Sequence, residues 1–118
     1  MAKENLIQGK SYQLSLDIIK LYKILKAETE YDIARQILRS GTSVGANVEE
    51  AIGAQSKRDF LSKMNISLKE ARETHYWLRL LKDSDMLKSE FDFLLDDALS
   101  IVSILSSIVK TLKNELNK

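Results

Sequence analysis

The feature that most constrains this chain is the absence of proline from all 118 residues, together with a count of only four glycines. Proline interrupts helices, so a chain without it has few points at which a long helix must end. Apolar residues recur along most of the sequence at the i, i+4, i+7 spacing of one helical face. No segment shows the apolar–polar alternation of a half-buried strand. These observations predict an all-α protein.

Four apolar rows predict four helices, over residues about 11–26, 30–54, 57–82 and 89–115. The last three rows follow a good N-capping residue with an aspartate three positions later, in the pairs Thr29–Asp32, Ser56–Asp59 and Ser89–Asp92. Connections of a few residues force consecutive helices to run antiparallel. We therefore predict one domain over residues 1–118, an antiparallel up-down-up-down four-helix bundle.

The core of this bundle is expected to include Leu38, Leu68, Leu78, Val102 and Leu105. Two glycines, Gly41 and Gly45, lie one turn apart in the second row. A glycine inside a helix costs about 1 kcal/mol relative to alanine. Close approach of a neighbouring helix explains that cost, so we expect a tight helix contact there.

Composition excludes several kinds of chemistry. The chain has no cysteine and one histidine, which excludes disulfides, zinc–cysteine sites, iron–sulfur clusters and thiol catalysis. Di-iron bundles need Glu-x-x-His pairs, whereas Arg72 stands three residues before His75. A lone histidine on a core row is more often hydrogen-bonded inside the bundle than a general base. We predict no catalytic residues, metal site or cofactor, and no enzymatic activity.

Charge and hydropathy indicate where the protein resides. Eighteen Lys and Arg face 17 Asp and Glu, so a net charge of +1 provides no global attraction to nucleic acid or to an anionic membrane. The polar N-terminus lacks the apolar stretch of a secretory signal. The most apolar segment, residues 101–109, is too short to span a bilayer. We expect a cytoplasmic protein with no membrane partner.

Two groups of residues off the core rows are candidates for a subunit interface. The third helix carries a second apolar arc, which is typical of an association surface, although scattered apolar residues are also normal on protein surfaces. The second helix turns polar residues, including Gln36 and Ser40, away from the predicted core. These are either solvated or hydrogen-bonded to a second subunit or a ligand. The candidate interface residues are Ser43, Asn47, Glu50, Ile66, Trp77, Leu80 and Leu81.

A basic stripe is predicted on the third helix, within about 80° of arc and with Tyr76 among its members. Its residues are Arg58, Lys69, Arg72 and Arg79. Such a stripe with an aromatic residue can follow a phosphate backbone. The alternative is that these cations pair with acids of the fourth helix, namely Asp92, Asp96 or Asp97.

Residues 40–51, SGTSVGANVEEA, and 56–81, SKRDFLSKMNISLKEARETHYWLRLL, resemble a family of small bacterial four-helix-bundle proteins. Members of that family are encoded within intervening sequences of large-subunit ribosomal RNA genes. The pattern is matched by Ser43, Ala46, Asn47 and Glu50, and then by Lys69, Glu70, Ala71, Arg72, Glu73 and Trp77. The resemblance extends from the first helix to Leu112.

The resemblance implies a homo-oligomer, a ring of five subunits. The family is also similar to the accessory proteins of diversity-generating retroelements, barrel-shaped pentamers that bind a reverse transcriptase and nucleic acid. Those relatives are strongly basic, whereas this chain is nearly neutral. The function expected is a non-enzymatic oligomeric scaffold that contacts RNA or a ribonucleoprotein. The alternative is a protein–protein interaction module that binds no nucleic acid.

Overall fold

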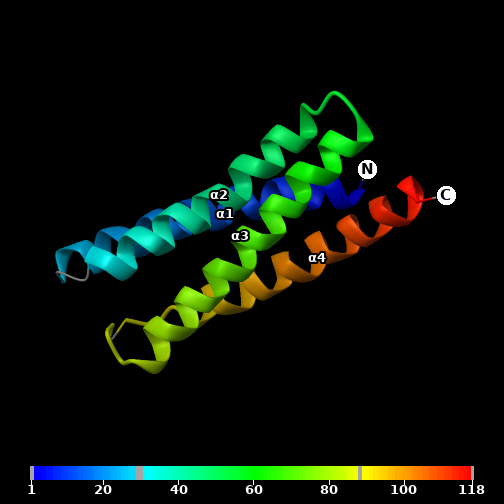
Figure 1. Cartoon of the computed structure of the whole chain (residues 1–118). Coiled ribbons are helices and arrows are strands. Elements are labelled where there is room, and N and C mark those ends of the chain that lie inside the picture. The colour runs from blue at the N-terminus through cyan, green and yellow to red at the C-terminus, as the bar shows by residue number, and fades with distance from the viewer. Residues whose placement is uncertain (1, 29–30, 88, 118) are drawn as a thin grey trace.

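The computed structural model describes residues 2–28, 31–87 and 89–117. Within these ranges the chain forms four helices and no strand: α1 (Ala2–Ala27), α2 (Tyr31–Ile52), α3 (Lys57–Asp83) and α4 (Asp92–Leu116). Successive helices run in opposite directions, so that both ends of the chain lie at the same end of the molecule (Figure 1). The predicted all-α four-helix bundle is confirmed.

The order of the helices around the bundle follows from which of them touch. Both α1 and α3 pack against α2 and against α4. Within the described residues no Cα atom of α1 lies within 8 Å of one in α3, and the same holds for α2 and α4. The helices α1 and α3 therefore occupy diagonally opposite corners. The bundle measures 50 × 22 × 22 Å, so each helix exposes a long outer side to solvent.

The core forms where the four apolar rows meet. Three of the five predicted core residues, Leu68, Leu78 and Leu105, are buried. The other two, Leu38 and Val102, are only half-buried and pack against the edge of the core. The apolar row of each helix is therefore correct. In α2 and α4, however, the middle of the buried side lies about one residue away from the predicted row.

The helix boundaries differ from prediction at two starts. The first helix begins at Ala2 instead of residue 11, because fully buried Ile7 continues the row of Leu14 toward the N-terminus. The fourth begins at Asp92 and not after Ser89. Its N-cap is Phe91, which forms no side-chain capping bond but is itself buried, so burial of an aromatic ring sets this start.

The capping predictions have separate outcomes. The prediction for Ser56 is confirmed, because its hydroxyl accepts a hydrogen bond of 3.0 Å from the backbone N–H of Asp59. The Ser89 cap is wrong, as the start of α4 shows. The predicted cap at Thr29 lies outside the described residues.

The predicted glycine contact is confirmed and joins α2 to α1. A Cβ atom at Gly41 would lie 2.8 Å from Cγ1 of Ile18, and one at Gly45 would lie 3.1 Å from the carbonyl oxygen of Ser11. Cβ atoms in real proteins do not come within 2.8 Å of another side-chain carbon, so a Cβ at position 41 would clash with Ile18. The two helices can therefore pack this closely only with glycine at position 41.

Replacing Gly41 with alanine is expected to destabilise the fold by about 1–3 kcal/mol, the usual effect of overpacking, despite the better helix propensity of alanine. The new methyl group meets the stiff β-branched side chain of Ile18 near its base. Urea denaturation followed by circular dichroism measures the change.

The matched control is Gly9→Ala, because Gly9 also lies inside a helix but a Cβ there meets nothing within 4 Å. This variant should be more stable by about 1 kcal/mol or less. If Gly41→Ala stabilises the protein as much as Gly9→Ala, the glycine contact does not constrain the packing of α1 and α2.

Candidate nucleic-acid and subunit interfaces

The seven Lys and Arg residues of α3 fall into two sets. Three are paired with carboxylates on neighbouring helices: Lys57 with Glu115 at 3.5 Å, Lys63 with Glu50 at 3.4 Å and Lys82 with Asp92 at 2.9 Å. The other four are Arg58, Lys69, Arg72 and Arg79, the residues of the basic stripe. They are exposed and form no ion pair within the described part of the chain. The alternative in which the stripe pairs with acids of α4 is therefore wrong for these residues.

An exposed aromatic ring accompanies the stripe. Tyr76 is 47% exposed, and the guanidinium carbon of Arg79 lies 5.8 Å from the centre of its ring. This is a cation–π arrangement on the solvent side of α3. The neighbouring Trp77 packs edge-on against Tyr76, with ring centres 5.4 Å apart. The stripe thus combines positive charge with a partly exposed aromatic ring.

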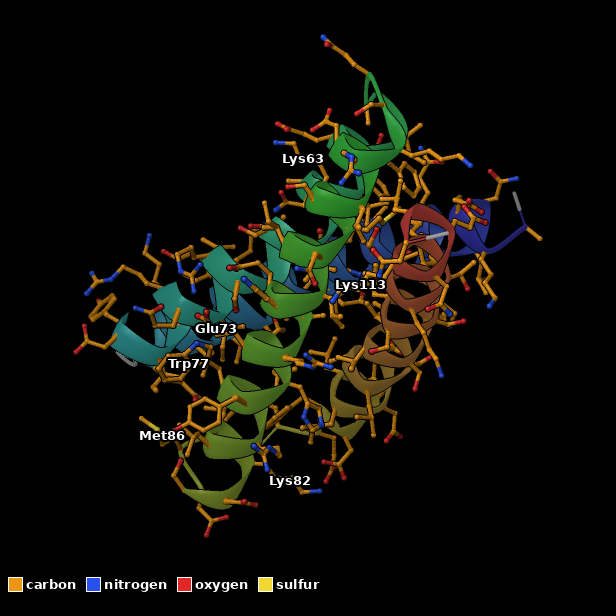
Figure 2. The ribbon with its side chains drawn as sticks, turned by 45° about the vertical axis from the view of Figure 1, so that its right-hand side comes forward. Lys63, Glu73, Trp77, Lys82, Met86 and Lys113 are labelled. Carbon is orange, nitrogen blue, oxygen red and sulfur yellow. The ribbon has the colours of Figure 1, made fainter. Side chains whose placement is uncertain are left out.

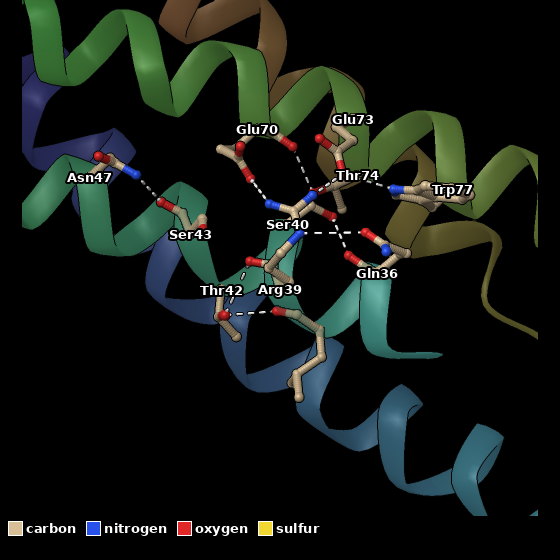
Figure 3. Close-up of polar contacts among 11 residues, drawn as sticks. Gln36, Arg39, Ser40, Thr42, Ser43, Asn47, Glu70, Glu73, Thr74 and Trp77 are labelled. Carbon is tan, nitrogen blue, oxygen red and sulfur yellow. Dashed lines mark hydrogen bonds and ion pairs between the residues drawn. The ribbon is translucent and has the colours of Figure 1, made fainter. Parts of the chain in front are cut away.

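A polar network joins α2 to α3 on the other side of α3 (Figure 3). Arg39 forms ion pairs with Glu73 and, at 3.0 Å, with Glu70. The indole N–H of Trp77 donates a 2.9 Å hydrogen bond to Glu73. This hydrogen bond, followed by the charge of Arg39, holds the pKa of Glu73 below its usual value. Half-buried Trp77 therefore forms a hydrogen bond within its own subunit. The sequence did not predict that this bond connects it, through Glu73, to Arg39.

Several predicted interface residues are less available than expected. Leu81 is fully buried, and so is Ser40, so the prediction that these two face outward is wrong. The buried side of α3 is wider than the single predicted row and extends toward α2, because α2 and α4 both pack against this helix. Ser40 donates its hydroxyl hydrogen bond to the carbonyl of Gln36 within its own helix, at 2.8 Å, which lets it lie in the core.

The remaining interface candidates lie at or near the surface. Asn47 is half-buried and donates a 2.8 Å hydrogen bond to the carbonyl oxygen of Ser43, which is also half-buried (Figure 3). Glu50 is exposed and paired with Lys63, as described above. The two aliphatic candidates are exposed, Ile66 at 39% and Leu80 at 38%. Their role in a subunit contact stays a prediction.

The helix α1 has an exposed apolar surface that was not predicted from the sequence. It consists of Tyr12, Leu16 and Ile19, which are 64%, 39% and 37% exposed. Their i, i+4, i+7 spacing is the same signal that identifies core rows, but the stronger row of Leu14 and Ile18 masked it. We call these three residues the α1 surface, and Ile66 with Leu80 the α3 surface.

His75 does not have the environment predicted for it. It is half-buried and makes no hydrogen bond to another residue in the described ranges, so the predicted hydrogen bond inside the bundle is wrong. Burial, and secondly the positive charge of Arg79, lower its pKa below the ordinary 6.5. The positive charge of Arg79, a residue of the basic stripe, thus contributes to the lowered pKa of the His75 ring.

This shift predicts a pH dependence of stability. Because the folded state favours neutral His75 while the unfolded chain binds a proton near pH 6.5, the free energy of unfolding should fall as the pH drops below 6.5. Arg79→Gln should raise the pKa of His75 part of the way to 6.5 and reduce this loss. An NMR titration of the one histidine ring measures the pKa, and Arg58→Gln, 17 residues from His75 in the same helix and so more than four turns away, is the control. Equal values in all three proteins would contradict the role of Arg79.

The described residues contain no group of three or more His, Asp or Glu side chains positioned to hold a metal ion. Over the same ranges, none of the helices combines the length and apolar character needed to cross a membrane.

Comparison with known proteins places the chain in a family. None of the curated proteins matches it. A solved structure is similar, with 44% sequence identity and a TM-score of 0.86, covering 92% of this chain and 98% of that one. It is the 1.70 Å crystal structure of a protein with unknown function from the S23 ribosomal protein family of Bacteroides thetaiotaomicron VPI-5482. The sequence model described as 23S rRNA-intervening sequence protein matches residues 3–107. With this match over most of its length, the chain belongs to the 23S rRNA-intervening sequence protein family.

Proposed function

We propose that this protein is a non-enzymatic homo-oligomeric scaffold that binds RNA, alone or within a ribonucleoprotein, along the basic stripe of α3. The observation that carries the proposal is the division of the α3 cations. Three of the seven are neutralised by carboxylates within the subunit, while the four that share the outer side of the helix are not. Unpaired, exposed cations are the groups that replace counterions on a phosphate backbone.

Self-association would provide the several basic stripes that a single subunit lacks. A net charge of +1 gives a single chain little attraction for RNA at a distance. In an oligomer the stripes are repeated, and a strand that contacts two of them binds the second at a high effective concentration. Weak contacts at each stripe then add to useful affinity.

The subunit contact we propose is head-to-tail, between the α1 surface of one subunit and the α3 surface of the next. The two surfaces differ in composition and lie on diagonally opposite helices, so one subunit cannot use both on the same neighbour. Contacts between unlike surfaces close into rings when the rotation allows it. The number five comes from the family resemblance alone.

A second candidate function, a protein–protein interaction module without nucleic acid, draws on the same exposed apolar side chains. In that case the α1 and α3 surfaces bind other proteins, and the stripe serves only solubility. The RNA titration below separates the two candidates.

Replacing Arg58, Lys69 and Arg79 together with glutamine should weaken binding of a single-stranded RNA and make it less sensitive to salt. The slope of log K against log salt is negative, and each lost phosphate contact makes it shallower by about 0.7, so the slope of the triple variant should be shallower by about 2. Filter binding at several salt concentrations measures both effects.

The matched control is the triple variant Lys20→Gln, Lys23→Gln and Lys26→Gln, which removes the same charge from exposed positions of α1. It should keep nearly the affinity and slope of the unaltered protein. Equal losses in the two variants would mean that only net charge matters, and an affinity that does not respond to salt would contradict phosphate contacts altogether.

Leu16→Glu and Leu80→Glu should each dissociate the oligomer, because each places a charge in one half of the proposed contact. Sedimentation of the unaltered protein at micromolar concentration should give a multiple of the 13.5 kDa chain mass. The control is Leu99→Glu on α4, where the side chain is 53% exposed and belongs to neither surface. A monomeric unaltered protein, or an oligomer that survives both variants, would refute the contact.

A further inference from the structure

A groove of about 350 Å³ lies between α3 and α4 and has an uneven charge. Its polar lining consists of Asn65 and Arg72 from α3 and of Ser106, Lys110, Lys113 and Asn114 from α4. No acidic residue is among the lining residues. In Figure 2, Lys113 lies between the ribbons of the two helices. The groove therefore collects three positive charges and no negative one.

The three cations of the groove are also without partners. Arg72, Lys110 and Lys113 form no ion pair within the described ranges, although α4 carries acids that pair with other α3 lysines. Like charges held together in this way repel one another. An anion bound among them would remove that repulsion, so the groove favours negatively charged ligands.

The chemistry of the lining suits phosphate. A guanidinium offers a planar pair of donors to two phosphate oxygens, and lysines add mobile point charges. The amides of Asn65 and Asn114 and the hydroxyl of Ser106 are further donors. The floor is apolar, formed by Leu68 and Val109, which are each 5% exposed. A volume of about 350 Å³ lies within the range of small-ligand sites.

A second hollow in the same molecule shows that this charge pattern is local. The hollow of about 550 Å³ formed by the beginnings of α1 and α3 and the end of α4 is larger. Its lysines, Lys3 and Lys57, are balanced by two acids, Glu4 and Glu115. It offers no net charge to an anion, and its size alone does not indicate a ligand.

We propose that the α3–α4 groove is a binding site for a phosphorylated ligand with at least two negative charges. The phosphate comes either from the backbone of a bound RNA or from a free small molecule such as a nucleoside diphosphate. Only Arg72 belongs both to the groove and to the basic stripe, so the groove and RNA binding along α3 can be tested separately.

Calorimetric titration with pyrophosphate at constant ionic strength tests the site on the intact protein. We expect saturable binding that the double variant Lys110→Gln and Lys113→Gln weakens at least tenfold. The double variant Lys20→Gln and Lys23→Gln loses the same charge from exposed positions on α1, far from the groove, and should bind as the unaltered protein does. All four positions are exposed, so folding is preserved and circular dichroism verifies it. Absence of saturable binding, or equal weakening in both variants, would overturn the proposal.

Competition distinguishes the two sources of phosphate. If the groove holds backbone phosphates, pyrophosphate displaces a single-stranded RNA and the Lys110, Lys113 variant binds that RNA more weakly. If it holds a free ligand, ADP and pyrophosphate bind while the RNA remains in place. The triple variant at Arg58, Lys69 and Arg79 keeps the groove lysines and should bind pyrophosphate normally. Loss of RNA binding in that variant, with pyrophosphate binding intact, would therefore concern the proposed function and not the groove.

Discussion

The contact between α1 and α2 at Gly41 and Gly45 determines how the rest of the bundle is arranged. Two helix backbones approach closely because no side chain separates them, and Ile18 fills the space above Gly41. This packing turns Leu16 and Ile19 away from α2 and toward solvent. A neighbouring side of α2 packs against α3. The pair of small residues thus sets how closely α1 and α2 pack, and with it which side chains α1 leaves exposed.

The contact between α2 and α3 is held by polar bonds as well as by apolar packing. The buried hydroxyl of Ser67 donates a 2.7 Å hydrogen bond to the carbonyl oxygen of Val44. At the periphery, Arg39 bridges Glu70 and Glu73. These bonds use the acids of α3 on the side that faces α2. The four cations of the basic stripe lie on another side of the same helix and form no ion pair within the described residues, so paired and unpaired charges are separated around α3.

Periodicity in the sequence was sufficient for the fold, because the apolar rows, the missing prolines and the short connections all favour one architecture. It was insufficient for the surface. Leu81 is buried because two helices cover α3, and a helical wheel of α3 alone cannot show how wide the covered side is. The stripe was predictable because its four members share one helix. The groove was not, since Arg72 and Lys113 are brought together only by the packing of α3 against α4.

The continuity of α3 from Lys57 to Asp83 gives the stripe a fixed length. Arg58 and Arg79 are 21 positions apart in one continuous helix, which places them about 32 Å apart along its axis at 1.5 Å per residue. The rise per residue of an α-helix does not change when a partner binds, so the distance between the two ends of the stripe stays the same. A nucleic acid that follows its whole length must itself be extended over that distance. A partner whose contact surface is shorter than that distance can touch only part of the stripe.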